Sequence, residues 1–250
     1  MTQKKVERKM NKWDVRAKIY DKLNWTLREN YMENFLKMCD LKSYYHACDV
    51  GTGTGAIANA VSKYCKDVKG TDISRDMLSI AKKKHNSSNI TYKLMNAENM
   101  SFKPNTFDCV TARMCFHHIE NQHAAIKDCF KILKPGCKFV ISEGIPPQGA
   151  RNFYTEMFKL KEKRRTYTID DLAALLEYGG FKDIRFEIHK MPNVSINNWL
   201  DNSGLSKETC KRLYNMHLDS PEYIKKAYNM KIINGDIYMD WLFAIASGMK

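Results

Sequence analysis

Three glycines that alternate with threonines are the residues best suited to bind a small ligand. They occupy residues 51–55 and follow the acidic residue Asp49, in the sequence DVGTGTG. Glycines at alternate positions let the backbone turn tightly and let a ligand lie against main-chain N–H groups at the start of a helix. Gly55 comes one residue earlier than the third glycine of the GxGxxG fingerprint of nicotinamide binding, and the GK[ST] ending of a phosphate-binding loop is absent. Because the Asp49 carboxylate would repel a pyrophosphate, we expect a ligand that carries positive charge.

A second acidic residue, Asp72, ends the second expected strand, 21 positions after Gly51. An acidic side chain at this distance from a glycine turn accepts hydrogen bonds from ribose hydroxyls in nucleotide-binding α/β folds. The alternative is that Asp72 caps the helix that follows it. Together with the glycine turn, Asp72 indicates a nucleoside site.

Two further groups of polar residues follow the fourth expected strand. Arg113 and Met114 come at its carboxyl end, where open α/β sheets bind ligands, so Arg113 either contacts an anionic group of a ligand or lies on the surface. His117, His118 and His123 come next. Their spacing is not that of metal ligands on one helical face, and no carboxylate or cysteine ligands accompany them, so we expect no metal. His117 is a candidate general base, with a packing histidine as the alternative.

Alternating strand and helix patterns position these residues. Residues 5–40 carry apolar side chains at helical spacing without proline or glycine, which predicts an N-terminal helical cap. From residue 46, short apolar strands alternate with helices of about ten residues, which predicts a parallel sheet with helices on both faces. The expected strands are residues 46–50, 67–73, 90–94, 107–112, 138–142, 183–188 and 238–247, and the expected helices are residues 56–64, 76–84, 121–133 (which stops before Pro135 and Gly136) and 170–178.

Two stretches, residues 144–168 and 190–235, interrupt this alternation. The second is too rich in aromatic side chains for a plain connection, which favours a lid over a substrate pocket. Trp199, Tyr214 and His217 are its candidate substrate contacts.

The order of the motifs resembles that of class I S-adenosylmethionine (SAM)-dependent methyltransferases. DVGTGTG is followed by KGTDIS, NAENMSF, FDCVTARMCFHHI and ILKPGCKFVISE, over about residues 44–143. Within that superfamily the chain is similar to the branch of the ubiquinone and menaquinone C-methyltransferases, which carry a segment like the IYDKLN of residues 19–24.

The resemblance implies an α/β fold with a Rossmann-like, seven-stranded, mostly parallel sheet. Helices would cover both faces, with an N-terminal helical cap and a helical insertion before the last strand. The implied division is residues 1–40 for the cap, 41–189 for the SAM-binding core, 190–235 for a substrate-facing lid and 236–250 for the last strand.

The resemblance also implies a role for each motif residue. Asp49 and the glycines of the turn would line the methionine moiety of SAM, and Asp72 would hold its ribose. Asn96 and Ala97 would contact adenine. The family usually has Asp where this chain has Asn96, whose side-chain carbonyl can still accept from the exocyclic amine. The implied contacts of SAM, and of its product S-adenosylhomocysteine, are Arg16, Tyr20, Asp49, Gly51, Thr52, Gly53, Gly55, Asp72, Ile73, Met77, Asn96, Ala97, Glu98, Arg113 and Met114.

Arg16 and Tyr20 lie one helical turn apart in the expected cap, where they either close over the SAM carboxylate or serve packing. The sulfonium methyl group is already activated, so the expected reaction is in-line transfer to a small-molecule acceptor at an oxygen, nitrogen, carbon or sulfur atom. If that atom must lose a proton, the candidate bases are His117, Glu143, His217 or a lid tyrosine, and the sequence does not choose among them.

Charge leaves a second class of substrate open. The chain has 250 residues and a net charge of +13, which would suit a nucleic-acid partner. Against a nucleic-acid methyltransferase, TARMCF stands where a base-flipping enzyme has (D/N)PPY, and no Pro-Cys nucleophile follows that strand. The basic residues occur in short groups, which is typical of a solvated surface. A non-catalytic SAM-binding protein is the remaining alternative.

The apolar segments and the cysteines indicate the compartment. No stretch is long and apolar enough for a membrane-spanning helix, and the first residues lack a hydrophobic signal region, so we expect a cytoplasmic protein. The eight cysteines form no CxxC pair and are expected to be reduced core residues rather than zinc ligands. The sequence leaves the oligomeric state open.

Overall fold

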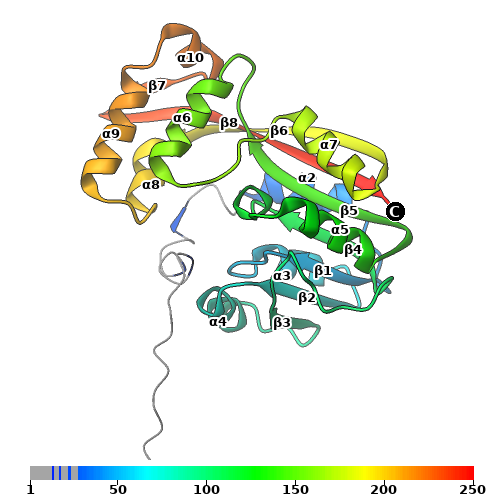
Figure 1. Cartoon of the computed structure of the whole chain (residues 1–250). Helices are drawn as coiled ribbons and strands as arrows, with labels where there is room; N and C mark the ends of the chain where they lie inside the picture. The colour runs from blue at the N-terminus through cyan, green and yellow to red at the C-terminus, as the bar shows by residue number, and fades with distance from the viewer. Residues whose placement is uncertain (1–12, 14–16, 18–21, 24–27) are drawn as a thin grey trace, which may run out of the picture.

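The computed structural model describes residues 13, 17, 22, 23 and 28–250 (Figure 1). Its continuous part begins just before helix α2 (Glu29–Cys39). The helical cap predicted over residues 5–40 therefore falls mostly outside the described residues, as do Arg16 and Tyr20.

One sheet organises the molecule, with the strand order β3-β2-β1-β4-β5-β8-β6 and a short β7 paired to β8. The strands from β3 to β5 are parallel neighbours, and β8 runs antiparallel to β5, β6 and β7. The predicted seven-stranded, mostly parallel sheet is confirmed, and the three-residue β7 is an addition to it. The bounds are β1 (His46–Val50), β2 (Asp67–Asp72), β3 (Ile90–Leu94), β4 (Phe107–Arg113), β5 (Leu133–Ile145), β6 (Lys182–Ser195), β7 (Lys231–Ile233) and β8 (Asp236–Met249).

Helices cover both faces of the sheet, because successive side chains of a strand point to opposite sides. In β1, for example, Ala47 belongs to one buried apolar core and Cys48 to the other. The chain leaves β1 for the first face and leaves β4 for the second, so a crevice forms between the carboxyl ends of these neighbouring strands. The first face carries α2, α3 (Ala56–Ser62) and α4 (Arg75–Lys84), and the second carries α5 (Gln122–Ile132) and α7 (Ile169–Gly179).

The strands at the antiparallel edge are longer than the sequence pattern predicts. β6 pairs with β8 as far as Ser195, whereas the predicted strand stops at residue 188. Beyond residue 188 the exposed residues Lys190, Pro192 and Asn193 alternate with the buried Met191 and Val194, so no apolar run marks this part of the strand. The boundary between α5 and β5 also differs from the prediction. Leu133 belongs to β5 and not to the helix, so Pro135 and Gly136 lie in the first residues of the strand.

The two stretches that interrupt the alternation form helices that gather where β5 ends and β8 begins (Figure 1). Residues 144–168 contain α6 (Arg151–Lys161), and the insertion before β8 contains α8 (Ile196–Asp201), α9 (Lys207–Leu218) and α10 (Glu222–Ala227). We call these four the lid helices; α9 contacts both α6 and α8. Within the part of the chain that the structure describes, no helix has the length and apolar character needed to cross a membrane.

Candidate active site

The glycine turn connects β1 to α3 in left-handed backbone. Gly51, Gly53 and Gly55 have φ values of 66°, 55° and 87°, which residues with a Cβ rarely adopt. A Cβ on Gly51 would lie only 2.5 Å from the Cβ of Cys115, whereas a Cβ on Gly53 would meet nothing within 4 Å. Gly51 therefore allows the strand ends to approach, and Gly53 leaves open space above the turn.

Asp72, at the end of β2, holds the glycine turn in place. Its Oδ2 accepts the Gly53 N–H at 2.8 Å, and its Oδ1 accepts the Ser74 N–H at 2.9 Å. The N-cap of α4 is Ser74, whose hydroxyl accepts the Met77 N–H at 3.2 Å. Asp72 is thus not the cap of this helix, and it borders the space above the turn.

A cavity of about 470 Å³ lies over the turn, between the carboxyl ends of β1, β2 and β4. This is the size of a pocket for a small organic ligand. The structure brings most of the predicted cofactor contacts together in its lining: Asp49, Gly51, Thr52, Gly53, Asp72, Ile73, Met77, Asn96, Ala97, Glu98, Arg113 and Met114.

Asp49 is the buried acid of this cavity, with 1% of its surface exposed. Its Oδ1 accepts the Thr111 hydroxyl at 2.8 Å, and its Oδ2 is buried without a hydrogen-bond partner among the described residues. Burial raises the pKa of the Asp49 carboxyl to about 6, although Arg113 favours its ionised form. A buried carboxylate oxygen without a donor is a suitable binding site for a cationic group.

A smaller cavity of about 80 Å³ adjoins the first and lies under the lid helices. Trp13, Met114 and His118 border both cavities, so ligands in the two would lie next to each other. Met114 has a left-handed φ of 54°, and its N–H donates to the Ser142 carbonyl oxygen at 2.8 Å. This strained backbone places a side chain at the border between the cavities. The other walls are largely apolar and aromatic, with a few charged groups: Leu23, His117, Gly144, Ile145, Tyr154, Met157, Phe158, Lys161, Glu162, Arg164, Trp199, Tyr228, Met239, Trp241, Leu242 and Phe243.

A family model and curated relatives point to a methyltransferase. Residues 48–141 match the model of a methyltransferase domain. The chain is 26% identical over 179 residues to the ubiquinone/menaquinone biosynthesis C-methyltransferase of Zymomonas mobilis. The matched region covers 70% of this chain and 72% of that one. The chain is a class I SAM-dependent methyltransferase. It resembles the ubiquinone and menaquinone C-methyltransferase branch, as the motifs predicted.

Solved methyltransferase structures have the same fold as this methyltransferase. The YcgJ protein of Bacillus subtilis matches with a TM-score of 0.79 and 16% identity, over 89% of this chain and 99% of that one. Phosphoethanolamine N-methyltransferase 2 of Haemonchus contortus, in complex with phosphomonomethylethanolamine and S-adenosylhomocysteine, matches with a TM-score of 0.67 and 21% identity. The second match covers 95% of this chain and 57% of that one. At these identities the two structures support the fold alone.

The larger cavity of the methyltransferase fits SAM. The unpartnered oxygen of Asp49 would accept from the ammonium of the methionine moiety, and Asp72 would accept from the ribose hydroxyls. Arg113, whose guanidinium lies 5.6 Å from the centre of the Tyr31 ring, would pair with the carboxylate. The open space above Gly53 leaves room for the ligand against the backbone.

Asn96 takes part in a turn of its own, which qualifies the predicted adenine contact. Its Oδ1 accepts the Glu98 N–H at 3.0 Å, so the carbonyl predicted to meet the exocyclic amine of adenine already holds the loop. Glu98 in turn accepts the Asn121 N–H at 3.1 Å, next to the start of α5. Both side chains still border the larger cavity, where they fix the shape of its wall.

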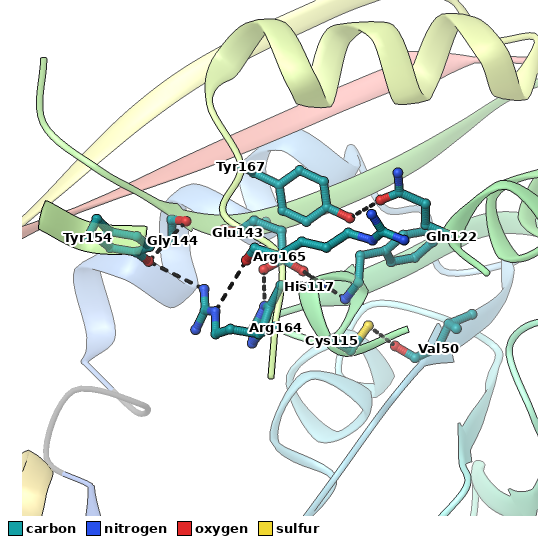
Figure 2. Close-up of polar contacts among 12 residues, drawn as sticks. Val50, Cys115, His117, Gln122, Glu143, Gly144, Tyr154, Arg164, Arg165 and Tyr167 are labelled. Atoms are coloured by element: carbon teal, nitrogen blue, oxygen red, sulfur yellow. Dashed lines mark hydrogen bonds and ion pairs between the residues drawn. The ribbon is translucent and has the colours of Figure 1, made fainter. Parts of the chain in front are cut away.

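His117 forms a buried pair with Glu143 in the wall of the smaller cavity (Figure 2). Its Nδ1 contacts Glu143 Oε2, and the other oxygen of Glu143 accepts the Phe116 N–H at 2.8 Å. The His117 and Glu143 side chains are 2% and 0% exposed. Burial raises the pKa of Glu143 to about 7, and Arg164 is the strongest opposing influence.

Several predicted site residues lie elsewhere. A Cβ on Gly55 would lie 2.6 Å from the Tyr92 hydroxyl, so this glycine serves packing and does not border the cavity. Tyr214 donates to the Gly235 carbonyl oxygen at 3.1 Å, and neither it nor His217 lines either cavity. His217 is fully buried and packs edge-on against Trp199, the one of the three lid candidates that does line the smaller cavity. Arg16 and Tyr20 lie outside the described residues.

The sequence prediction missed the contribution of α6. Tyr154, Met157, Phe158 and Lys161 all line the smaller cavity, and their spacing of three and four residues is that of one helical face. That periodicity was the available signal. His118, which borders both cavities next to the predicted His117, was also missed as a site residue. The described residues hold no group of three or more potential metal ligands, and all eight cysteines are free thiols.

Proposed function

We propose that this methyltransferase transfers the methyl group of SAM to a small-molecule acceptor held in the smaller cavity. The observation that carries the proposal is the pair of adjoining cavities, which share Met114 and His118. One has the lining expected for a nucleoside with a cationic side group, and the other has aromatic walls. The names of the relatives, which specify quinone C-methylation and phosphoethanolamine N-methylation, support a small acceptor.

The residues of the chain mainly bind, orient and exclude water. SAM, when bound, supplies a methyl carbon activated by the sulfonium, so the barrier falls chiefly by aligning the acceptor atom with it. We assign this alignment to Met114 and His118, which stand where the cavities meet. Trp199 and Phe158 close the acceptor side against water, which strengthens the electrostatic interactions inside.

We assign the role of general base to His117 for acceptors that lose a proton. The contact between Glu143 and His117 Nδ1 fixes the orientation of the imidazole ring and keeps its proton on Nδ1, so that Nε2 is the basic atom. The active form has Glu143 ionised and His117 neutral. Because the pKa of Glu143 is raised to about 7, this form prevails above about pH 7, and the rate should rise with pH through that region.

The acceptor can be found by incubating the protein with methyl-labelled SAM and a metabolite extract, and identifying the labelled product. The proposal expects label in a small molecule. Label only in nucleic acid or protein fractions, or in nothing while SAM binds, would overturn it.

Replacing His117 tests the base. His117→Gln should lower the rate at saturating SAM about 100-fold or more and remove its rise near neutral pH. His123→Gln is the matched control, because His123 is exposed, stacks on Tyr178 and lines neither cavity. An unchanged pH profile in His117→Gln would assign proton removal to another group.

A further inference from the structure

The charged groups of the smaller cavity are not equally compensated. Lys161 has a side chain that is 4% exposed and forms an ion pair with Glu162 at 2.6 Å, so these two charges neutralise each other. Arg164 has no carboxylate oxygen within 4.0 Å among the described residues. Glu143, whose ionised form Arg164 favours, is already bonded to His117 and to the Phe116 N–H.

The Arg164 guanidinium is held in a fixed place. Its carbon lies 3.8 Å from the centre of the Phe158 ring, which is stacking distance. One terminal nitrogen donates to the Tyr154 hydroxyl at 3.3 Å, and Tyr154 itself donates to the Gly144 carbonyl oxygen at 3.2 Å. The Nε atom donates to the Arg165 carbonyl oxygen at 3.3 Å. Figure 2 shows Arg164 between Tyr154 and His117, close to Glu143.

A preorganised guanidinium with unused donors in an aromatic cavity selects for an anionic, planar ligand. Arginine presents five N–H donors in a planar fork that matches a carboxylate, and among the described residues two of the Arg164 nitrogens have hydrogen-bond partners. The aromatic walls, Phe158, Trp199 and Trp241, suit a flat ring.

We infer that the acceptor is a small aromatic or conjugated acid whose carboxylate binds Arg164. This inference rests on the proposed function and goes beyond it by naming the class of acceptor and the residue that selects it. A carboxylate on Arg164 would place the ring of the acceptor among the aromatic walls of the cavity, which His117 also lines.

Paired probes that differ in one group test the inference without any methyl transfer. The protein is saturated with S-adenosylhomocysteine and titrated with 4-nitrobenzoate or 4-nitrobenzamide, while quenching of tryptophan fluorescence reports binding beside Trp199 and Trp241. We expect the acid to bind about 10- to 100-fold more tightly than the amide, as a charge-assisted hydrogen-bonded pair allows. Equal binding of acid and amide by the wild-type protein would overturn the inference, and this comparison needs no variant to fold.

Variants assign the preference to Arg164. Arg164→Met should weaken binding of the acid to the level of the amide and leave the amide nearly unchanged, and Arg164→Lys should restore part of the preference because it keeps the charge. The matched control is Arg165→Met, which removes the same charge from the next residue. The Arg165 guanidinium donates to the Glu120 carbonyl oxygen at 3.0 Å and does not line the smaller cavity. Equal weakening of acid and amide in Arg164→Met would show a structural role only.

Calorimetry with S-adenosylhomocysteine distinguishes a wrong class of acceptor from a wrong proposed function. If the protein binds the cofactor and transfers label to an uncharged small molecule, the inference is overturned and the proposed function stands. Failure to bind the cofactor would overturn the proposed function itself.

Discussion

At the scale of single residues, Gly53 and Gly136 have the same backbone requirement and different surroundings. Their φ values are 55° and 73°, and a Cβ on either would meet nothing within 4 Å. Each substitution to Ala should therefore cost about 1–2 kcal/mol of stability from left-handed strain alone. Of these two glycines, Gly53 alone borders the larger cavity, so Gly53→Ala should also weaken SAM, by about tenfold or more, because its methyl group enters the space of the ligand. Urea unfolding and calorimetry measure the two effects, and equal loss of SAM affinity in both variants would contradict this account.

The buried carboxyl of Asp49 should lower the stability of the protein without ligand. Its pKa is about 6 in the folded protein against 3.8 for the free side chain, so the unfolded chain binds fewer protons between these values and stability falls as pH rises through them. Asp49→Asn removes this penalty. We expect the variant to be more stable than wild type by roughly 2–3 kcal/mol above pH 7 and by almost nothing near pH 4.

The same substitution should weaken SAM, because the amide cannot replace the ionised oxygen opposite an ammonium group. In the wild-type protein SAM affinity should also fall below about pH 6, where Asp49 becomes protonated. Urea unfolding at several pH values and calorimetry at the same values measure both effects. A variant that is less stable than wild type above pH 7 would show that the Asp49 carboxylate stabilises the fold.

The cofactor side of the site could be predicted at this scale, and the acceptor side could not. Gly51, Gly53 and Asp72 belong to one strand-helix-strand unit, so their sequence spacing sets their spatial relation. The pair of His117 and Glu143 joins residues 26 positions apart, and the sequence offered both only as separate candidates. Arg164 acquires its role from packing on Phe158, and no spacing rule gives the direction of a loop side chain.

At the scale of elements, the start of α7 controls the loop that carries Arg164. Thr168 is the N-cap of this helix and forms a capping box with Asp171. Thr168→Ala should cost about 1 kcal/mol of stability, and it should also weaken 4-nitrobenzoate more than SAM because the loop before α7 loosens. Ser206→Ala removes a similar cap from α9, remote in sequence from Arg164, and should lower stability alone. Unfolding curves and fluorescence titrations measure these effects, and equal weakening of 4-nitrobenzoate by both variants would refute the link.

Which elements could be predicted follows from how their residues are buried. β1 and β3 have the predicted bounds, and β1 is buried from Ala47 to Val50, as expected of a central strand covered on both faces. Most side chains of β6 are exposed or half-buried. Its last residues belong to the strand because they pair with β8, which is a long-range contact. The insertion was predicted from its aromatic content, but its division into α8, α9, α10 and β7 depends on packing against the rest of the lid.

At the scale of the whole molecule, the positive net charge and the acidic lining of the larger cavity are separate features. The chain carries a net charge of +13, yet Asp49, Asp72, Glu98 and Glu120 line the larger cavity. Polyanions are therefore attracted to the outer surface and repelled by the carboxylates that line the larger cavity. The basic surface includes the exposed lysines 82–84 at the end of α4.

Nucleic acid should therefore bind to this protein weakly and without being methylated. Retention on single-stranded DNA or transfer RNA should fall steeply between about 50 and 200 mM salt, because it arises from release of counterions rather than from a shaped site. Changing lysines 82–84 to glutamate should lower retention further and leave SAM affinity and small-molecule methylation unchanged, since these side chains line neither cavity. Filter binding and incubation with methyl-labelled SAM measure the two quantities. Label in the nucleic acid that persists at the higher salt would mean that the basic surface guides a nucleic-acid substrate, and the small-molecule acceptor would then have to be abandoned.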